Sequence, residues 1–199
     1  VAIDEWTFLI VSREHDHPDN DIAADFIKQT LSKLELEVHD QEYNSMGRNI
    51  IAIQTGIEYP EQEYIICAHY DAVISYCADD NASSVAAILE AARILSKYDT
   101  KYTIIYTFFD EEEINCQGSY YYATEANGKD ENIHGVINLE MLGWDSNGDN
   151  LFNIRTKDIS NSVSHANIAK DLNEEHKMGL VPVILNPGAA NSDHASFWS

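Results

Sequence analysis

Side chains that bind divalent metals recur at five points of the sequence, most of which follow a short apolar run. These points are His69-Tyr70-Asp71, Asp79-Asp80-Asn81, Asp110-Glu111-Glu112-Glu113, Glu140 and Ser192-Asp193-His194. Two imidazoles and several carboxylates suit one or two divalent transition metals, above all Zn²⁺. The absence of a sulfur-rich cluster argues against a structural zinc site or an iron–sulfur cluster. The residue types therefore indicate a metal centre with nitrogen and oxygen ligands.

The apolar runs and the amphipathic stretches between them predict the elements that would position these side chains. We expect strands at residues 50–53, 64–68, 102–109, 136–139 and 181–185. We expect helices at 22–34, 85–95 (with Asn81 as N-cap), 118–126 and 161–176. Strands that alternate with helices predict an α/β fold, with a mostly parallel central sheet and helices on both faces.

Parallel strands place their carboxyl ends along one edge of a sheet, where functional clefts of such folds lie. The metal-binding side chains should therefore meet at this edge. Each group also has an ordinary explanation: a solvated acidic loop at 110–113, or helix capping at 79–81. Four carboxylates and two histidines gathered without a cation would repel one another, so their joint placement favours the metal site.

Length and charge indicate the number of domains and exclude some classes of partner. The chain has 199 residues, which predicts one domain over residues 1–199. It has 12 Lys and Arg residues and 34 Asp and Glu residues, so the formal net charge is −22. Such a surface repels phosphate backbones and anionic lipids, and we expect neither a nucleic-acid partner nor a membrane partner. No apolar run reaches the length of a membrane span.

Five segments, in the same order, resemble the co-catalytic di-zinc aminopeptidases of the bacterial leucyl aminopeptidase type. That family is related to glutamate carboxypeptidase and to the glutaminyl cyclases. The segments are Ala68-His69-Tyr70-Asp71, Ala78-Asp79-Asp80-Asn81-Ala82-Ser83, Glu112-Glu113 with Gly118-Ser119, Asn138-Leu139-Glu140-Met141 and Ser192-Asp193-His194-Ala195-Ser196. The resemblance implies a phosphorylase/aminopeptidase-like sandwich and a zinc-peptidase catalytic domain.

The resemblance also implies a set of metal ligands: His69, Asp80, Glu113, Glu140 and His194. Asp80 would bridge two Zn²⁺ ions. One ion would be held by His69 and Glu140, and the other by Glu113 and His194. The same ligands could also hold Co²⁺ or Mn²⁺.

Two further carboxylates would complete the catalytic machinery that the resemblance implies. Asp71 would orient the ring of His69. Glu112 would be the general base for water activated by the two zinc ions. The expected activity is that of a metal-dependent exopeptidase, an aminopeptidase that hydrolyses N-terminal residues from peptides with a free amino terminus.

The chain departs from the family at several positions. Ser84 and Asn115 stand where glycines are usual, Tyr76-Cys77 replaces a Pro-Gly pair, and Glu140 stands where many members have Asp. We also expect the usual C-terminal strand and helix to be missing, which would leave an apolar flank at Phe197 and Trp198 and favour a homodimer through this region. The family suggests a secreted or periplasmic protein, although no signal peptide is visible.

Two other readings stay open. One is a one-zinc enzyme similar to glutaminyl cyclase, which would not need His69 as a ligand. The other is a catalytically inactive homologue that serves as a binding protein, for which lost ligands or a lost base would be typical. Both His69 and Glu112 are present, so the aminopeptidase is the leading interpretation.

Overall fold

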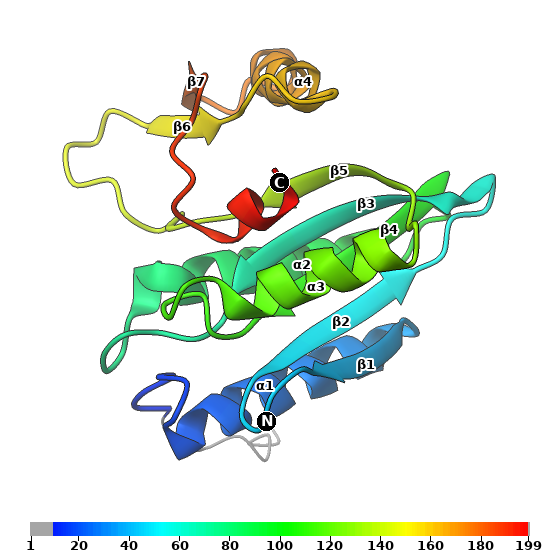
Figure 1. The fold of residues 1–199 in the computed structure, drawn as a ribbon. Helices are drawn as coiled ribbons and strands as arrows, with labels where there is room; N and C mark the ends of the chain where they lie inside the picture. The colour runs from blue at the N-terminus through cyan, green and yellow to red at the C-terminus, as the bar shows by residue number, and fades with distance from the viewer. Residues whose placement is uncertain (1–9, 199) are drawn as a thin grey trace, which may run out of the picture. The chain divides into compact units, whose positions relative to one another are not determined.

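The computed structural model describes residues 10–198, which divide into two compact units. The first comprises the chain up to Gly143 together with Ser192–Phe197, and the second contains Trp144–Asn191 and Trp198. The elements of the first unit (Figure 1) are α1 (Pro18–Leu31), η1 (Ser32–Leu34), β1 (Glu37–Glu42), β2 (Arg48–Gln54), β3 (Tyr59–His69), η2 (Ala78–Ser83), α2 (Ser84–Leu95), β4 (Tyr102–Phe109), α3 (Gln117–Gly128), β5 (Ile133–Asn138) and η3 (Asp193–Phe197). Those of the second are β6 (Leu151–Arg155), α4 (Ser162–Glu175) and β7 (Val181–Leu185).

The described strands of the first unit form a sheet in the order β1-β2-β4-β3-β5. The pairs β3/β4 and β3/β5 are parallel, whereas β1/β2 and β2/β4 are antiparallel. The expected α/β architecture is confirmed, and the sheet is mixed because β2 runs against β4 and is joined to the added strand β1. The parallel part, β4-β3-β5, is the part that ends at the metal-binding side chains.

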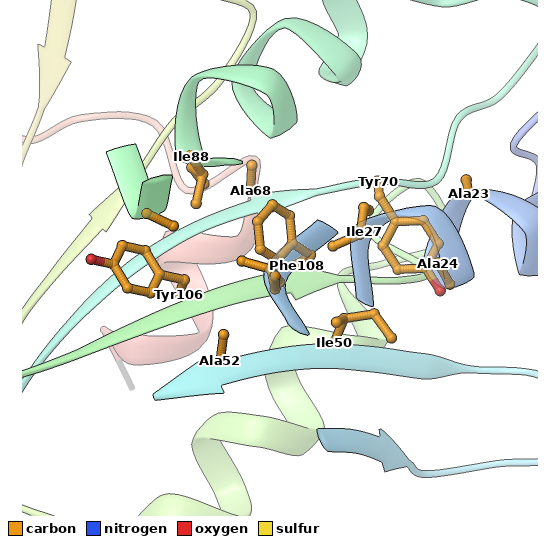
Figure 2. Packing of buried hydrophobic residues seen from close by; sticks show 12 residues of the cluster. Ala23, Ala24, Ile27, Ile50, Ala52, Ala68, Tyr70, Ile88, Tyr106 and Phe108 are labelled. Atoms are coloured by element: carbon orange, nitrogen blue, oxygen red, sulfur yellow. The ribbon is translucent and has the colours of Figure 1, made fainter. Parts of the chain in front are cut away.

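Helices cover both faces of this sheet, as the sequence predicts (Figure 1). Successive side chains of a strand point to opposite faces. Ile50 and Phe108 therefore pack into a core with α1 and α2, shown in Figure 2. Ile51 and Phe109 pack on the opposite face, where Tyr122 of α3 closes a second, smaller core.

Two helix starts differ from the sequence prediction. Helix α1 begins at Pro18 instead of residue 22, because proline suits the first turn and the ring of His17 accepts a hydrogen bond from Asp19 N (3.1 Å). The prediction that Asn81 caps a helix is wrong. Helix α2 begins at Ser84 after the π-helical turn η2, and the Asn81 amide instead donates to Leu139 O (3.0 Å) beyond β5.

The second unit contains a parallel pair of strands, β6 and β7, and the helix α4, which contacts β7. The helix and strand expected at 161–176 and 181–185 are confirmed, whereas β6 was not predicted. Within residues 10–198, no helix combines the length and the apolar character needed to span a membrane.

The C-terminal turn η3 returns to the first unit and packs against α3 and β5. The ring of Phe197 lies 6.3 Å from that of Phe109 and 6.1 Å from that of Tyr122, measured between centroids. Phe197 is thus only partly exposed and extends the second core. The homodimer through this region stays a prediction.

Replacing Phe108 by Ala should destabilise the first unit, because the ring is fully buried between the sheet and helices α1 and α2. We expect the free energy of unfolding to fall by about 3–5 kcal/mol in urea denaturation. Ile57→Ala is the matched control, since Ile57 is 66% exposed, and it should change stability by less than about 0.5 kcal/mol. Equal effects of the two substitutions would contradict the assigned core.

Candidate metal centre

The ring of His69 lies at the centre of a group of carboxylates at the carboxyl end of β3. Its Nε2 atom is 3.3 Å from Asp80 Oδ1, 3.5 Å from Glu140 Oε1 and 3.9 Å from Glu112 Oε2. Glu112 follows β4 and Glu140 follows β5, the parallel neighbours of β3 on either side. The shared direction of these three strands therefore brings together residues that are up to 71 positions apart, as the sequence predicts.

Two sets of potential ligand atoms lie close enough together to hold a metal. One is formed by His69, Asp80 and Glu113, and the other by His69, Glu112 and Glu140; within each set the ligand atoms lie within 4.8 Å of one another. Glu113 Oε1 is buried and has no hydrogen-bond partner among the described residues. An unpartnered buried carboxylate oxygen beside an imidazole fits a cation ligand, and the nitrogen and oxygen donors suit Zn²⁺.

Asp71 holds three parts of this group in place. It is 1% exposed, and its Oδ1 atom lies 3.2 Å from His69 Nδ1. The same carboxylate accepts hydrogen bonds from the backbone N–H groups of Glu112 and Glu113, both at 3.1 Å. A carboxylate on Nδ1 orients the ring and leaves Nε2 to face the other carboxylates. The orienting role of Asp71 in a metal site stays a prediction.

The electrostatics of the group reflect carboxylates that crowd one imidazole. Burial alone would lower the pKa of His69, but hydrogen bonds to Asp71, Asp80 and Glu140 outweigh it and raise that pKa above its ordinary value. Burial, together with the charge of Asp80, raises the pKa of Glu113 to about 7. Without a metal, the group therefore attracts protons, which is the behaviour expected of a cation site.

A second layer of polar side chains supports Glu140. Ser192 Oγ donates a hydrogen bond to Glu140 Oε2 (2.7 Å) and accepts one from Asn138 Nδ2 (3.0 Å). Asn138 Nδ2 also lies 3.5 Å from His194 Nδ1. The supporting role of Asn138 was missed from the sequence, although its position two residues before Glu140, at the end of a strand, was a usable signal.

The structure brings His69, Asp80, Glu112, Glu113 and Glu140 together, and it places His194 nearby on η3. Among the described residues, the ring of His194 belongs to neither of the two close sets. Its role as a ligand stays a prediction. Asp193, adjacent to it, is fully buried, and burial raises its pKa to about 8.

Comparison with known proteins bears on this site. A family model described as peptidase family M28 matches residues 49–199. The chain belongs to this family. The match covers every residue of the candidate metal centre and leaves residues 1–48 outside it.

Relatives and solved structures agree with this membership. The chain is 36% identical over 110 residues to a "Probable zinc metalloprotease" of Pyrenophora tritici-repentis, covering 51% of this chain and 23% of that one. It is 35% identical over 104 residues to aminopeptidase YwaD of Bacillus subtilis, covering 50% and 23%. The matched segments thus span about a quarter of these relatives.

The fold is also that of solved enzymes with little sequence identity. A leucine aminopeptidase precursor from Bacteroides thetaiotaomicron superposes with a TM-score of 0.81 at 18% identity, covering 94% of this chain and 76% of that chain. A Porphyromonas gingivalis glutaminyl cyclase superposes with a TM-score of 0.80 at 22% identity, covering 94% and 74%. At such identities the likeness concerns the fold alone.

Replacing Asp71 by Asn should weaken metal binding. The amide of asparagine has one acceptor oxygen and no charge, whereas the carboxylate of Asp71 uses both oxygens to contact His69 and two backbone N–H groups. We expect zinc affinity, measured by competition with a chromophoric chelator, to fall by roughly 10–100-fold. Asp99→Asn, at an exposed position between α2 and β4, is the control and should bind zinc like the unmodified protein. Unchanged affinity in Asp71→Asn would remove its orienting role.

Proposed function

We propose that this chain carries the catalytic centre of a zinc-dependent aminopeptidase, which hydrolyses the N-terminal residue from peptides with a free amino terminus. The observation that carries the proposal is the ring of His69, which faces Asp80 and Glu140 at 3.3 and 3.5 Å with Glu112 and Glu113 beside them. The names of relatives support zinc and peptide hydrolysis.

The ligands proposed for the metal are four members of the two close sets, with one residue added from η3: His69, Asp80, Glu113, Glu140 and His194. The remaining member of the sets, Glu112, has a different role. Asp80 is the residue we assign as the bridge between two ions, because its carboxylate contacts His69 and belongs to the set that contains Glu113. When bound, zinc in such a centre supplies a Lewis acid for the scissile carbonyl and lowers the pKa of water toward neutrality.

Glu112 is the residue we assign as general base. Burial is the largest influence on its carboxyl group and raises its pKa, which makes the carboxylate a better proton acceptor. Cys116 Sγ donates to Glu112 Oε1 across 3.7 Å and restricts the orientation of the carboxylate. Glu112 would take a proton from the attacking water and deliver it to the leaving amine.

The substrate class follows from charge. The protein carries a formal charge of −22, and several acidic side chains line the proposed centre. Such a field favours a substrate with a positively charged end. A free N-terminal ammonium group is that end in a peptide.

Incubation with aminoacyl-nitroanilides and with N-terminal glutamine peptides tests the proposal directly. We expect release of nitroaniline that a chelator abolishes and added Zn²⁺ restores, since the ligand set needs a cation. Ring closure of glutamine without nitroaniline release would favour the glutaminyl cyclase activity instead. Inactivity of the zinc-loaded protein on both substrates would favour a binding protein.

Replacing Glu112 by Gln should separate catalysis from metal binding. Removing the base should lower kcat on the order of 10²-fold or more, while zinc content measured by atomic absorption stays close to that of the unmodified protein. Glu61→Gln, at an exposed position of β3, is the matched control and should retain full activity. Full activity in Glu112→Gln would show that another group takes the proton.

A further inference from the structure

A buried arginine near the start of the described chain binds the loop that connects β3 with η2. The guanidinium group of Arg13, a residue that is 9% exposed, donates hydrogen bonds to backbone carbonyl groups at both ends of this loop. The acceptors are Tyr70 O (from Nε, 2.7 Å), Tyr76 O (from Nη1, 3.2 Å), Cys77 O (from Nη2, 2.9 Å) and Asp80 O (from Nη2, 3.4 Å). One side chain therefore spans the loop from the residue after His69 to Asp80.

The backbone around Arg13 reinforces the same contact. Ala72 N donates to Arg13 O at 3.1 Å, and Tyr76 N donates to Val11 O at 2.9 Å. Asn20 Nδ2, at the first turns of α1, donates to Arg13 O at 3.0 Å and so anchors the arginine to the first unit. Residues 11–13 thus pair with the loop through backbone hydrogen bonds.

The loop needs such support, because its backbone is strained where it turns toward Asp80. Tyr76 has a φ of 73° and Cys77 a φ of 25°, both in the region that non-glycine residues rarely adopt. The guanidinium group holds the carbonyls of these two residues in a fixed fork that a lysine ammonium group cannot reproduce. The contacts thereby keep a strained turn in one conformation.

We propose that Arg13 is a positioning residue of the metal centre, which fixes the carboxylate of Asp80 opposite His69 by holding the backbone of the loop. The proposal rests on the zinc site proposed above and extends that site to residues 11–13, which lie outside the part of the chain that the family model matches. The guanidinium group of Arg13 donates to backbone carbonyl groups and not to the carboxylates that we propose as ligands. Its effect passes through the carbonyls of the loop.

Charge and position make opposite predictions for Arg13. Loss of a buried positive charge beside Asp71 and Asp80 would, by charge alone, strengthen the binding of a cation. Loss of the backbone contacts would displace Asp80 and weaken the binding of the cation. Arg13→Lys keeps the charge but loses the fork, so it distinguishes the two effects.

The test measures zinc affinity of the purified protein and of Arg13→Gln and Arg13→Lys by competition with a chromophoric chelator. We expect affinity to fall roughly tenfold or more in Arg13→Gln and several-fold in Arg13→Lys. Arg93→Gln, which removes an exposed arginine paired with Glu90, is the control and should bind zinc like the unmodified protein. Zinc affinity in Arg13→Lys equal to that of the unmodified protein, or increased affinity in Arg13→Gln, would overturn the proposal.

Two further measurements separate this role from general stability. The first measures the free energy of unfolding of the zinc-free variants by urea denaturation. A merely structural role of Arg13 would lower this free energy and leave the zinc affinity of the folded protein unchanged. Millimolar guanidinium ion is added to Arg13→Gly, and partial recovery of zinc affinity is expected if the fork is what matters. If the unmodified protein binds no zinc, the proposed function fails; if it binds zinc and the variants match it, only the role of Arg13 fails.

Discussion

The repulsion among carboxylates around one buried imidazole is the constraint on which the rest of this structure depends. His69 is 1% exposed, yet Asp71, Asp80, Glu112 and Glu140 all come within 4 Å of its ring nitrogens. In a medium of low polarity such a group is stable only with a positive charge at its centre. The raised pKa of His69 and of Glu113 expresses this need in terms of protons. A divalent cation meets it more fully, because it supplies two charges and accepts several ligands.

The fold meets this constraint by holding the charged side chains through hydrogen bonds, several of which come from neutral groups. Parallel strands β3, β4 and β5 bring the charged side chains to one edge of the sheet, where Asp71 orients His69 and neutral donors hold other parts of the group. Backbone N–H groups of Glu112 and Glu113 bind Asp71, and the Asn81 side chain ties η2 to the chain beyond β5. These neutral contacts bring no additional negative charge into the centre. They keep the ligands close even though the ligands repel one another.

Much of this arrangement could be predicted from the sequence, for physical reasons that particular elements show. Strand β4 is a continuous run of β-branched and aromatic residues, so its bounds were found correctly, and polar residues that follow buried strands located the centre. Strand β1 was missed, because its sequence EVHDQE is charged and only half buried. The helix cap at Asn81 was wrong, since capping rules consider local backbone partners and this amide bonds to residues about 60 positions away. Arg13 left no pattern at all, because it recognises backbone carbonyls, which every sequence has.

The side chain of Glu140, which we propose as a ligand, is longer than the aspartate that the sequence resemblance leads us to expect there, and its placement depends on its neighbours. Glutamate has one more rotatable bond than aspartate, so holding its carboxylate at a fixed point costs more conformational entropy. Here Ser192 donates to one oxygen of Glu140 at 2.7 Å, and Asn138 in turn donates to Ser192. The other oxygen is left to face His69 at 3.5 Å. The two hydrogen bonds, from Asn138 to Ser192 and from Ser192 to Glu140, therefore favour one rotamer of Glu140. They limit the freedom of this longer side chain, which an aspartate would lack because it is shorter. Ser192 and His194 lie in the same short segment, Ser192–Phe197, which belongs to the first unit. The support of Glu140 and the position of His194 therefore both depend on where this segment packs.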